Sequence, residues 1–168
     1  MSGSDVHDNA RMPKERALPH DPDVEVDEDS LGRPLAMHLT PTAIALVFVG
    51  GSLGVLARAG LDHRFPAGTG FPATTFAVNV GGALALAVLI ETLAVRGPDA
   101  GHRRALRLLL GTGVLGGFTT YSALAVQTDT LLRSGQAVTA LVYAAGTVAV
   151  GLAASITGII GTRWALTR

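Results

Sequence analysis

Neutral hydrogen-bonding groups are concentrated in one apolar stretch of this chain, Gly111–Ser122, which reads GTGVLGGFTTYS. Glycine costs about 1 kcal/mol relative to alanine inside a helix, and Ser and Thr side chains compete for backbone partners, so the stretch predicts an interrupted helix. At the middle of a membrane, freed carbonyls can bind cations and freed amides can face anions. The alternative is a close helix crossing in which the glycines let two backbones touch.

Other uncharged polar side chains lie in neighbouring apolar runs. Asn79 is one, and its amide in hydrocarbon costs several kcal/mol unless it is hydrogen-bonded, which a single interhelical bond would satisfy. Tyr143, Thr147, Gly151 and Ser155 recur every four residues, which places them on one helix face. Together these groups form a lining without fixed charge, which suits a small anion that must shed water and still leave.

No arrangement typical of catalysis is visible in the sequence. The apolar runs contain no paired acids, histidine cluster or Ser/His/Asp set, and Glu91 stands alone at the end of one run. The chain has no cysteine, which excludes disulfides and thiol chemistry. We therefore expect a protein that is not an enzyme, and nothing indicates a nucleic-acid partner.

The composition predicts an all-α membrane protein. Hydrophobic residues make up 48% and charged residues 15% of the 168, and the mean hydropathy is +0.41. A spanning helix needs about 20 largely apolar residues. Four stretches free of Asp, Glu, Lys and Arg have that length: Leu39–Ala57, Phe65–Ile90, Leu108–Thr128 and Ser134–Thr162. We expect four transmembrane helices, the third broken near its middle.

The N-terminal segment differs from the rest. Residues 1–40 hold nine acids and four bases, and four prolines lie among them. Such a segment cannot bury enough apolar surface to offset its chain entropy. We expect residues 1–38 to form a disordered acidic tail and residues 39–168 to form the membrane domain, with the first apolar helix uncleaved.

The charge distribution predicts an orientation. Short connections between the spans make neighbouring helices antiparallel and place both termini on one side. Three arginines lie on the other side: Arg58, Arg64 and Arg133. Seven arginines lie on the side of the termini: Arg33, Arg96, Arg103, Arg104, Arg107, Arg163 and Arg168. The bias favours cytoplasmic termini.

These residues resemble the Fluc (CrcB) family of fluoride channels. The resemblance rests on Gly50–Gly54 with Arg58, on Phe71–Thr75 followed by Asn79, on Gly113–Ser122, and on Tyr143 in the Gly/Ser-rich fourth run. It covers nearly all of the chain after the tail.

The resemblance implies a passive fluoride-selective channel in the bacterial inner membrane, made of two four-helix chains in opposite orientations. It also implies a structural sodium ion, not transported, held by the backbone carbonyls of Gly116 and Thr119, and glycine at 116 fits a backbone that must bend. The implied fluoride pore consists of matching side chains: Asn79, Tyr121, Ser122, Tyr143, Thr147 and Ser155. Arg58 matches a vestibule arginine, although it could equally snorkel to the interface.

One position departs from the family. Two phenylalanines three residues apart usually turn their electropositive ring edges toward the anion. Here Tyr121 and Leu124 stand at these positions, and leucine has no ring. The leucine and the arginine bias both favour an oppositely oriented sister chain over self-pairing.

The sequence therefore predicts a channel subunit that exports fluoride from the cytoplasm and lowers its toxicity. Two alternatives remain open. A small four-span multidrug or cation exporter is similar in length, but it relies on a glutamate in its first span, where this chain has no acid. A non-transporting scaffold would use the glycines only for packing.

Overall fold

A computed structural model describes residues 26–28, 34–36 and 40–168, in two separate units, Met1–Met37 and His38–Arg168. In the first unit, β1 (Val26–Glu28) pairs antiparallel with β2 (Pro34–Ala36). The rest of the tail predicted over residues 1–38 lies outside the described residues, and its disorder stays a prediction.

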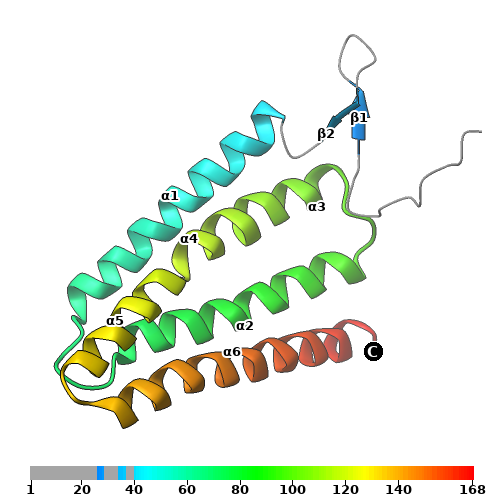
Figure 1. The fold of residues 1–168 in the computed structure, drawn as a ribbon. Helices are drawn as coiled ribbons and strands as arrows, with labels where there is room; N and C mark the ends of the chain where they lie inside the picture. Colours follow the sequence, from blue (N-terminus) through cyan, green and yellow to red (C-terminus); the bar gives the residue numbers. More distant parts are fainter. Residues whose placement is uncertain (1–25, 29–33, 37–39) are drawn as a thin grey trace, which may run out of the picture. The chain divides into compact units, whose positions relative to one another are not determined.

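The elements of residues 40–168 are all helices (Figure 1). In chain order they are α1 (Pro41–Arg64), α2 (Ala73–Val95), α3 (Gly101–Leu106), η2 (Arg107–Leu115), α4 (Gly116–Phe118), α5 (Tyr121–Arg133) and α6 (Ala137–Leu166). Four helical segments are long and apolar enough to cross a membrane, the third being Gly101–Arg133. The predicted number of spans is confirmed.

The helices continue past the C-terminal ends of the uncharged runs that predicted them, and α2 begins at Ala73 instead of Phe65. α1 continues through Arg58 and Asp62, which lie one turn apart with 4.0 Å between a guanidinium nitrogen and a carboxylate oxygen. At its start, Thr40 caps the helix by accepting a hydrogen bond from the amide of Ala43, and Pro41 occupies the first turn. A rule that ends a span at the first charge therefore places the helix end too early.

Close backbone contacts join α1 to the third span. α1 packs along η2 and α4, while α2 packs along α6 (Figure 1). A Cβ atom added to Gly54 would collide with the carbonyl oxygen of Val114, and one added to Gly117 would collide with that of Gly51. A Cβ added to Gly113 would lie 2.9 Å from the Cα of Gly50, which is also too close. The close-crossing interpretation is therefore correct for Gly113 and Gly117, which let two backbones touch.

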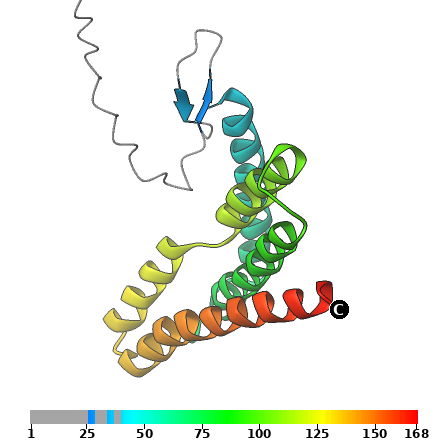
Figure 2. The same cartoon turned by 90° about the vertical axis from the view of Figure 1, so that its right-hand side faces the viewer.

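The direction of the chain changes between α4 and α5. α4 ends at Phe118, and Thr119 and Thr120 have extended backbone with ψ of 157° and 122°. α5 then begins at Tyr121. Figure 2 shows α5 leaving the line of the preceding helical segments at this connection.

The α1 crossing makes a prediction about stability. Gly54→Ala places a methyl group against the carbonyl of Val114, so we expect the free energy of unfolding to fall by about 1–3 kcal/mol. Thermal unfolding in detergent measures the change. Gly51→Ala is the matched control, because the nearest atom to its added Cβ is 4.0 Å away. Equal stability of the two variants would contradict the contact.

Candidate functional site

A two-way pairing between Asn79 of α2 and the backbone of Thr120 lies at the centre of the site. The Asn79 side-chain nitrogen donates to the Thr120 carbonyl at 3.0 Å, and its oxygen accepts from the Thr120 amide at 2.8 Å. α2 comes close here because position 82 is glycine, where an added Cβ would collide with the side-chain methyl of Thr119. The interhelical bond expected for Asn79 is therefore present, and it is directed at the α4–α5 connection.

This pairing changes the partners of two carbonyls. In a continuous α-helix the Gly116 carbonyl would accept from the Thr120 amide, and the Thr119 carbonyl from the Ala123 amide. Here the Thr120 amide donates to Asn79, and the Ala123 amide donates to the hydroxyl of Thr120 at 3.1 Å. Gly116 and Thr119, the two residues expected to offer carbonyls to sodium, have therefore lost their helical donors. These two neutral carbonyl oxygens are suited to binding a cation.

One expectation about Gly116 is wrong. Its backbone is ordinary right-handed helix, with φ of −65° and ψ of −37°. The change of direction falls on Thr119 and Thr120, whose extended conformations are open to any residue. Glycine is thus not required at 116 for bending, and a Cβ there would meet only the carbonyl oxygen of Gly111 at 3.9 Å.

An open groove of about 430 Å³ lies beside the connection. Residues of α2, the third span and α6 line it: Asn79, Ala83, Gly116, Thr119, Thr120, Tyr121, Leu124, Thr147, Val148 and Gly151. Five of these belong to the predicted site: Asn79, Gly116, Thr119, Tyr121 and Thr147. No lining residue is charged, and the Tyr121 side chain is 82% exposed on the single chain.

The other predicted site residues lie near the groove without lining it. On α6, Tyr143 is fully buried, and Ser155 donates to the Gly151 carbonyl at 3.1 Å. The Ser122 and Thr120 hydroxyls are 3.2 Å apart. Arg58 donates to the Gly117 carbonyl at 3.4 Å, so it contacts the turn before the connection.

Sequence reasoning left two polar residues out of the site. Gln127 of α5 accepts a hydrogen bond from the Tyr143 hydroxyl at 2.6 Å and donates to the Thr75 hydroxyl at 2.9 Å. This bridge links α2, α5 and α6, and Phe71 packs edge-on against the Tyr143 ring. The signal was present, because Gln127 is a second amide in an apolar run and the argument applied to Asn79 applies to it as well.

The groove offers hydrogen-bond donors without net charge. The amide of Asn79 has two N–H groups, of which Thr120 takes one. The Thr120 hydroxyl accepts from Ala123, so its own hydrogen can turn to another acceptor. Among the residues that the structure describes, no buried side-chain N or O atom lacks a partner, and Glu91 is paired with Arg163 at 2.8 Å.

Four apolar spans around an uncharged polar groove define a multi-pass membrane protein whose polar groups are suited to a small ion. The family model described as "CrcB-like protein, Camphor Resistance (CrcB)" matches residues 45–159. The chain belongs to this family.

Named relatives are similar over most of their length. "Fluoride-specific ion channel FluC 2" of Leifsonia xyli is 51% identical over 123 residues, 73% of this chain and 85% of the relative. "Fluoride-specific ion channel FluC 1" of Cutibacterium acnes is 48% identical over 112 residues, 66% of this chain and 78% of the relative. A FluC of Novosphingobium aromaticivorans is 41% identical over 122 residues, 70% of this chain and 94% of the relative.

The Gln127 bridge predicts an energetic coupling. Gln127→Leu removes the acceptor of the buried Tyr143 hydroxyl, and we expect it to lower the free energy of unfolding by about 1–3 kcal/mol. Adding Tyr143→Phe should recover part of this loss, because both polar groups are then gone. A double-mutant cycle in detergent measures the coupling. Additive losses in the double variant would show that the hydrogen bond is not formed.

Proposed function

We propose that this chain is a subunit of a passive fluoride-selective channel that lets fluoride leave the cytoplasm and lowers its toxicity. The observation that carries the proposal is the uncharged groove beside the Asn79–Thr120 pairing. The names of the relatives support it, since they are called fluoride-specific ion channels.

The groove can replace water around the anion. The second N–H of Asn79 and the hydroxyl of Thr120 donate to fluoride, and Tyr121 presents its ring edge. Thr147 extends this lining on α6, where its hydroxyl now donates to the Tyr143 carbonyl at 2.6 Å and can turn toward the ion. Fluoride leaves again because no arginine lines the groove to hold it.

The path extends along α6 and α5 in this proposal. Tyr143 and Ser155 lie one turn before Thr147 and one turn after Gly151, and Ser122 lies one residue after Tyr121. The Gln127 bridge fixes the Tyr143 hydroxyl. Arg58 serves the vestibule through its contact with the Gly117 carbonyl.

A sodium ion fits the carbonyls of Gly116 and Thr119. When bound, the ion supplies positive charge to oxygens whose helical donors are used elsewhere. Asn79 and the Thr120 hydroxyl leave these carbonyls free for the ion, because they accept hydrogen bonds from the two amides that would donate to the carbonyls in a continuous helix. No group of three or more His, Cys, Asp or Glu side chains that could hold a metal ion occurs within the described part of the chain, so this binding would rest on neutral oxygens.

The functional unit is a pair of chains in opposite orientations. Tyr121 is exposed at the groove, and an adjoining apolar groove of about 790 Å³ between α5 and α6 shares Tyr121, Leu124 and Val148 with it. A second chain would close both grooves. Leu124 supplies no ring edge, so a sister chain is favoured over self-pairing. The arginine bias favours termini in the cytoplasm of a bacterial cell, with the channel in the inner membrane.

Fluoride efflux from loaded liposomes tests the pore. Asn79→Asp places a negative charge beside the anion and removes the donor to Thr120. A like charge at about 4 Å costs about 4 kcal/mol at an effective dielectric of 20, so we expect flux to fall by about 100-fold or more. A fluoride electrode reads the rate, and unchanged flux would remove Asn79 from the pore. The protein is reconstituted with a sister chain if it needs one.

Two threonines of α6 test whether a hydroxyl affects fluoride flux because it lines the groove or only because it lies in the helix. Thr147 and Thr157 both donate to the carbonyl four residues back, but Thr147 lines the groove whereas Thr157 is exposed. We expect Thr147→Val to reduce fluoride flux about tenfold through loss of one hydrogen-bonding group, and Thr157→Val to leave it unchanged. Equal flux in the two variants would contradict the assignment of Thr147.

The pairing of chains is tested with the wild-type protein purified alone. We expect weak fluoride flux from the single chain and robust flux after co-expression with an oppositely oriented relative, in sodium-containing buffer. Withdrawal of sodium should reduce flux or dissociate the pair. Robust flux from the single chain would show that it pairs with itself.

A further inference from the structure

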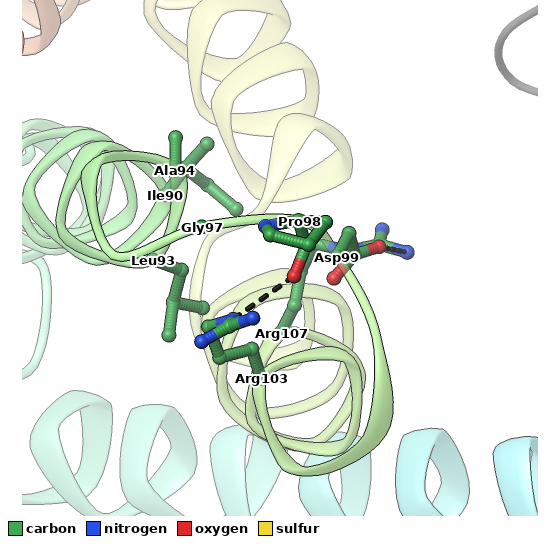
Figure 3. A pocket seen from close by; sticks show the side chains of 8 residues that line it. All are labelled: Ile90, Leu93, Ala94, Gly97, Pro98, Asp99, Arg103 and Arg107. Atoms are coloured by element: carbon green, nitrogen blue, oxygen red, sulfur yellow. Dashed lines mark hydrogen bonds and ion pairs between the residues drawn. The ribbon is translucent and has the colours of Figure 1, made fainter.

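A second pocket lies at the connection between α2 and α3 and shares no residue with the fluoride groove. Its volume is about 480 Å³. Eight residues line it: Ile90, Leu93, Ala94, Gly97, Pro98, Asp99, Arg103 and Arg107. Figure 3 shows Ile90, Leu93 and Ala94 projecting from α2 on one side, with Arg103 and Arg107 rising from the third span on the other.

The backbone of the connection positions Arg103. Its Nε donates to the Pro98 carbonyl at 2.9 Å (Figure 3), and one terminal nitrogen donates to the Arg96 carbonyl at 3.1 Å. Gly97 has a positive φ of 126°, and a Cβ there would lie 3.1 Å from the other terminal nitrogen. A guanidinium carries five N–H groups, so two bonds to the protein leave donors for a ligand.

Arg107 is held beside it by an acid. Its guanidinium contacts one carboxylate oxygen of Asp99 at 2.6 Å, and its side chain is 39% exposed. Asp99 is the single acid in residues 96–107, against four arginines. Two arginines and one acid line the pocket, so its lining carries one excess positive charge and complements an anion.

The pocket lies at the ends of two spans, because α2 ends at Val95 and the third span begins at Gly101. This is the level at which lipid headgroups meet a membrane protein, and basic pockets between transmembrane helices bind anionic headgroups. We propose that this pocket binds an anionic phospholipid, with Arg103 and Arg107 on its phosphate and an acyl chain against Ile90 and Leu93. The apolar wall of α2 selects a lipid over free phosphate, because phosphate has no hydrocarbon to cover it.

Lipid binding to the full chain in neutral detergent tests the proposal. The probes are phosphatidylglycerol, phosphatidylcholine and inorganic phosphate, and native mass spectrometry counts the molecules retained. We expect one phosphatidylglycerol per chain, bound at least fivefold more tightly than phosphatidylcholine, and no competition by inorganic phosphate. One arginine near a membrane surface corresponds to about a fivefold change in affinity, so Arg107→Gln should weaken phosphatidylglycerol binding about fivefold or more.

Two further variants separate binding from structural damage. Asp99→Asn breaks the same ion pair as Arg107→Gln but removes a negative charge, so we expect it to strengthen phosphatidylglycerol binding. Arg133→Gln breaks a comparable 2.6 Å pair with Asp129 at the other end of the third span, and we expect no change. The Asp99→Asn result decides the matter even if Arg107→Gln does not fold.

Three results would overturn the proposal. One is equal affinity for the two lipids, and another is weaker phosphatidylglycerol binding in both the Asp99 and Arg107 variants. The third is displacement of phosphatidylglycerol by inorganic phosphate, which would make the pocket a free-anion site.

Discussion

The pairing of one amide side chain with one backbone unit organises the centre of this protein. Asn79 satisfies both the N–H and the C=O of Thr120, so the third span can depart from helical geometry inside the bundle without leaving that residue unpaired. The Thr120 hydroxyl then caps α5, which restarts the helix at once. Three features depend on this change of hydrogen-bond partners: the groove, the two carbonyls without helical donors and the exposure of Tyr121.

Glycines serve a different purpose from the threonines of the same stretch. Gly113 and Gly117 contact the backbone of Gly50 and Gly51 in α1, so the first half of the third span packs closely against α1. The extended residues that follow lie where this contact ends. The glycines that pack against α1 and the threonines that interrupt the helix are therefore neighbouring but different residues. The uncharged groove lies beside the threonines, where the close contact with α1 has ended.

The sequence was sufficient for the large features of the fold. Long runs without charge are rare outside membranes, so the four spans could be predicted, whereas their ends could not, because Arg58 and Asp62 continue α1 beyond its apolar run. The free-energy cost of an unpaired amide in hydrocarbon predicted a buried role for Asn79. The sequence could not distinguish a glycine at which the backbone bends from a glycine at which two helices pack, because the difference depends on the neighbouring helix. Gln127 was missed although it is an amide in an apolar run, like Asn79. Thr75 was missed because only the packing of α2 against α5 brings it to Gln127.

A density map of the protein in a lipid bilayer with sodium fluoride would show the Asn79–Thr120 pairing and the proposed cation together. We expect the Asn79 side chain to hydrogen-bond both backbone groups of Thr120, and cation density to lie at the carbonyls of Gly116 and Thr119. A continuous third helix in which the Thr120 amide bonds the Gly116 carbonyl, with Asn79 turned to lipid, would contradict this expectation.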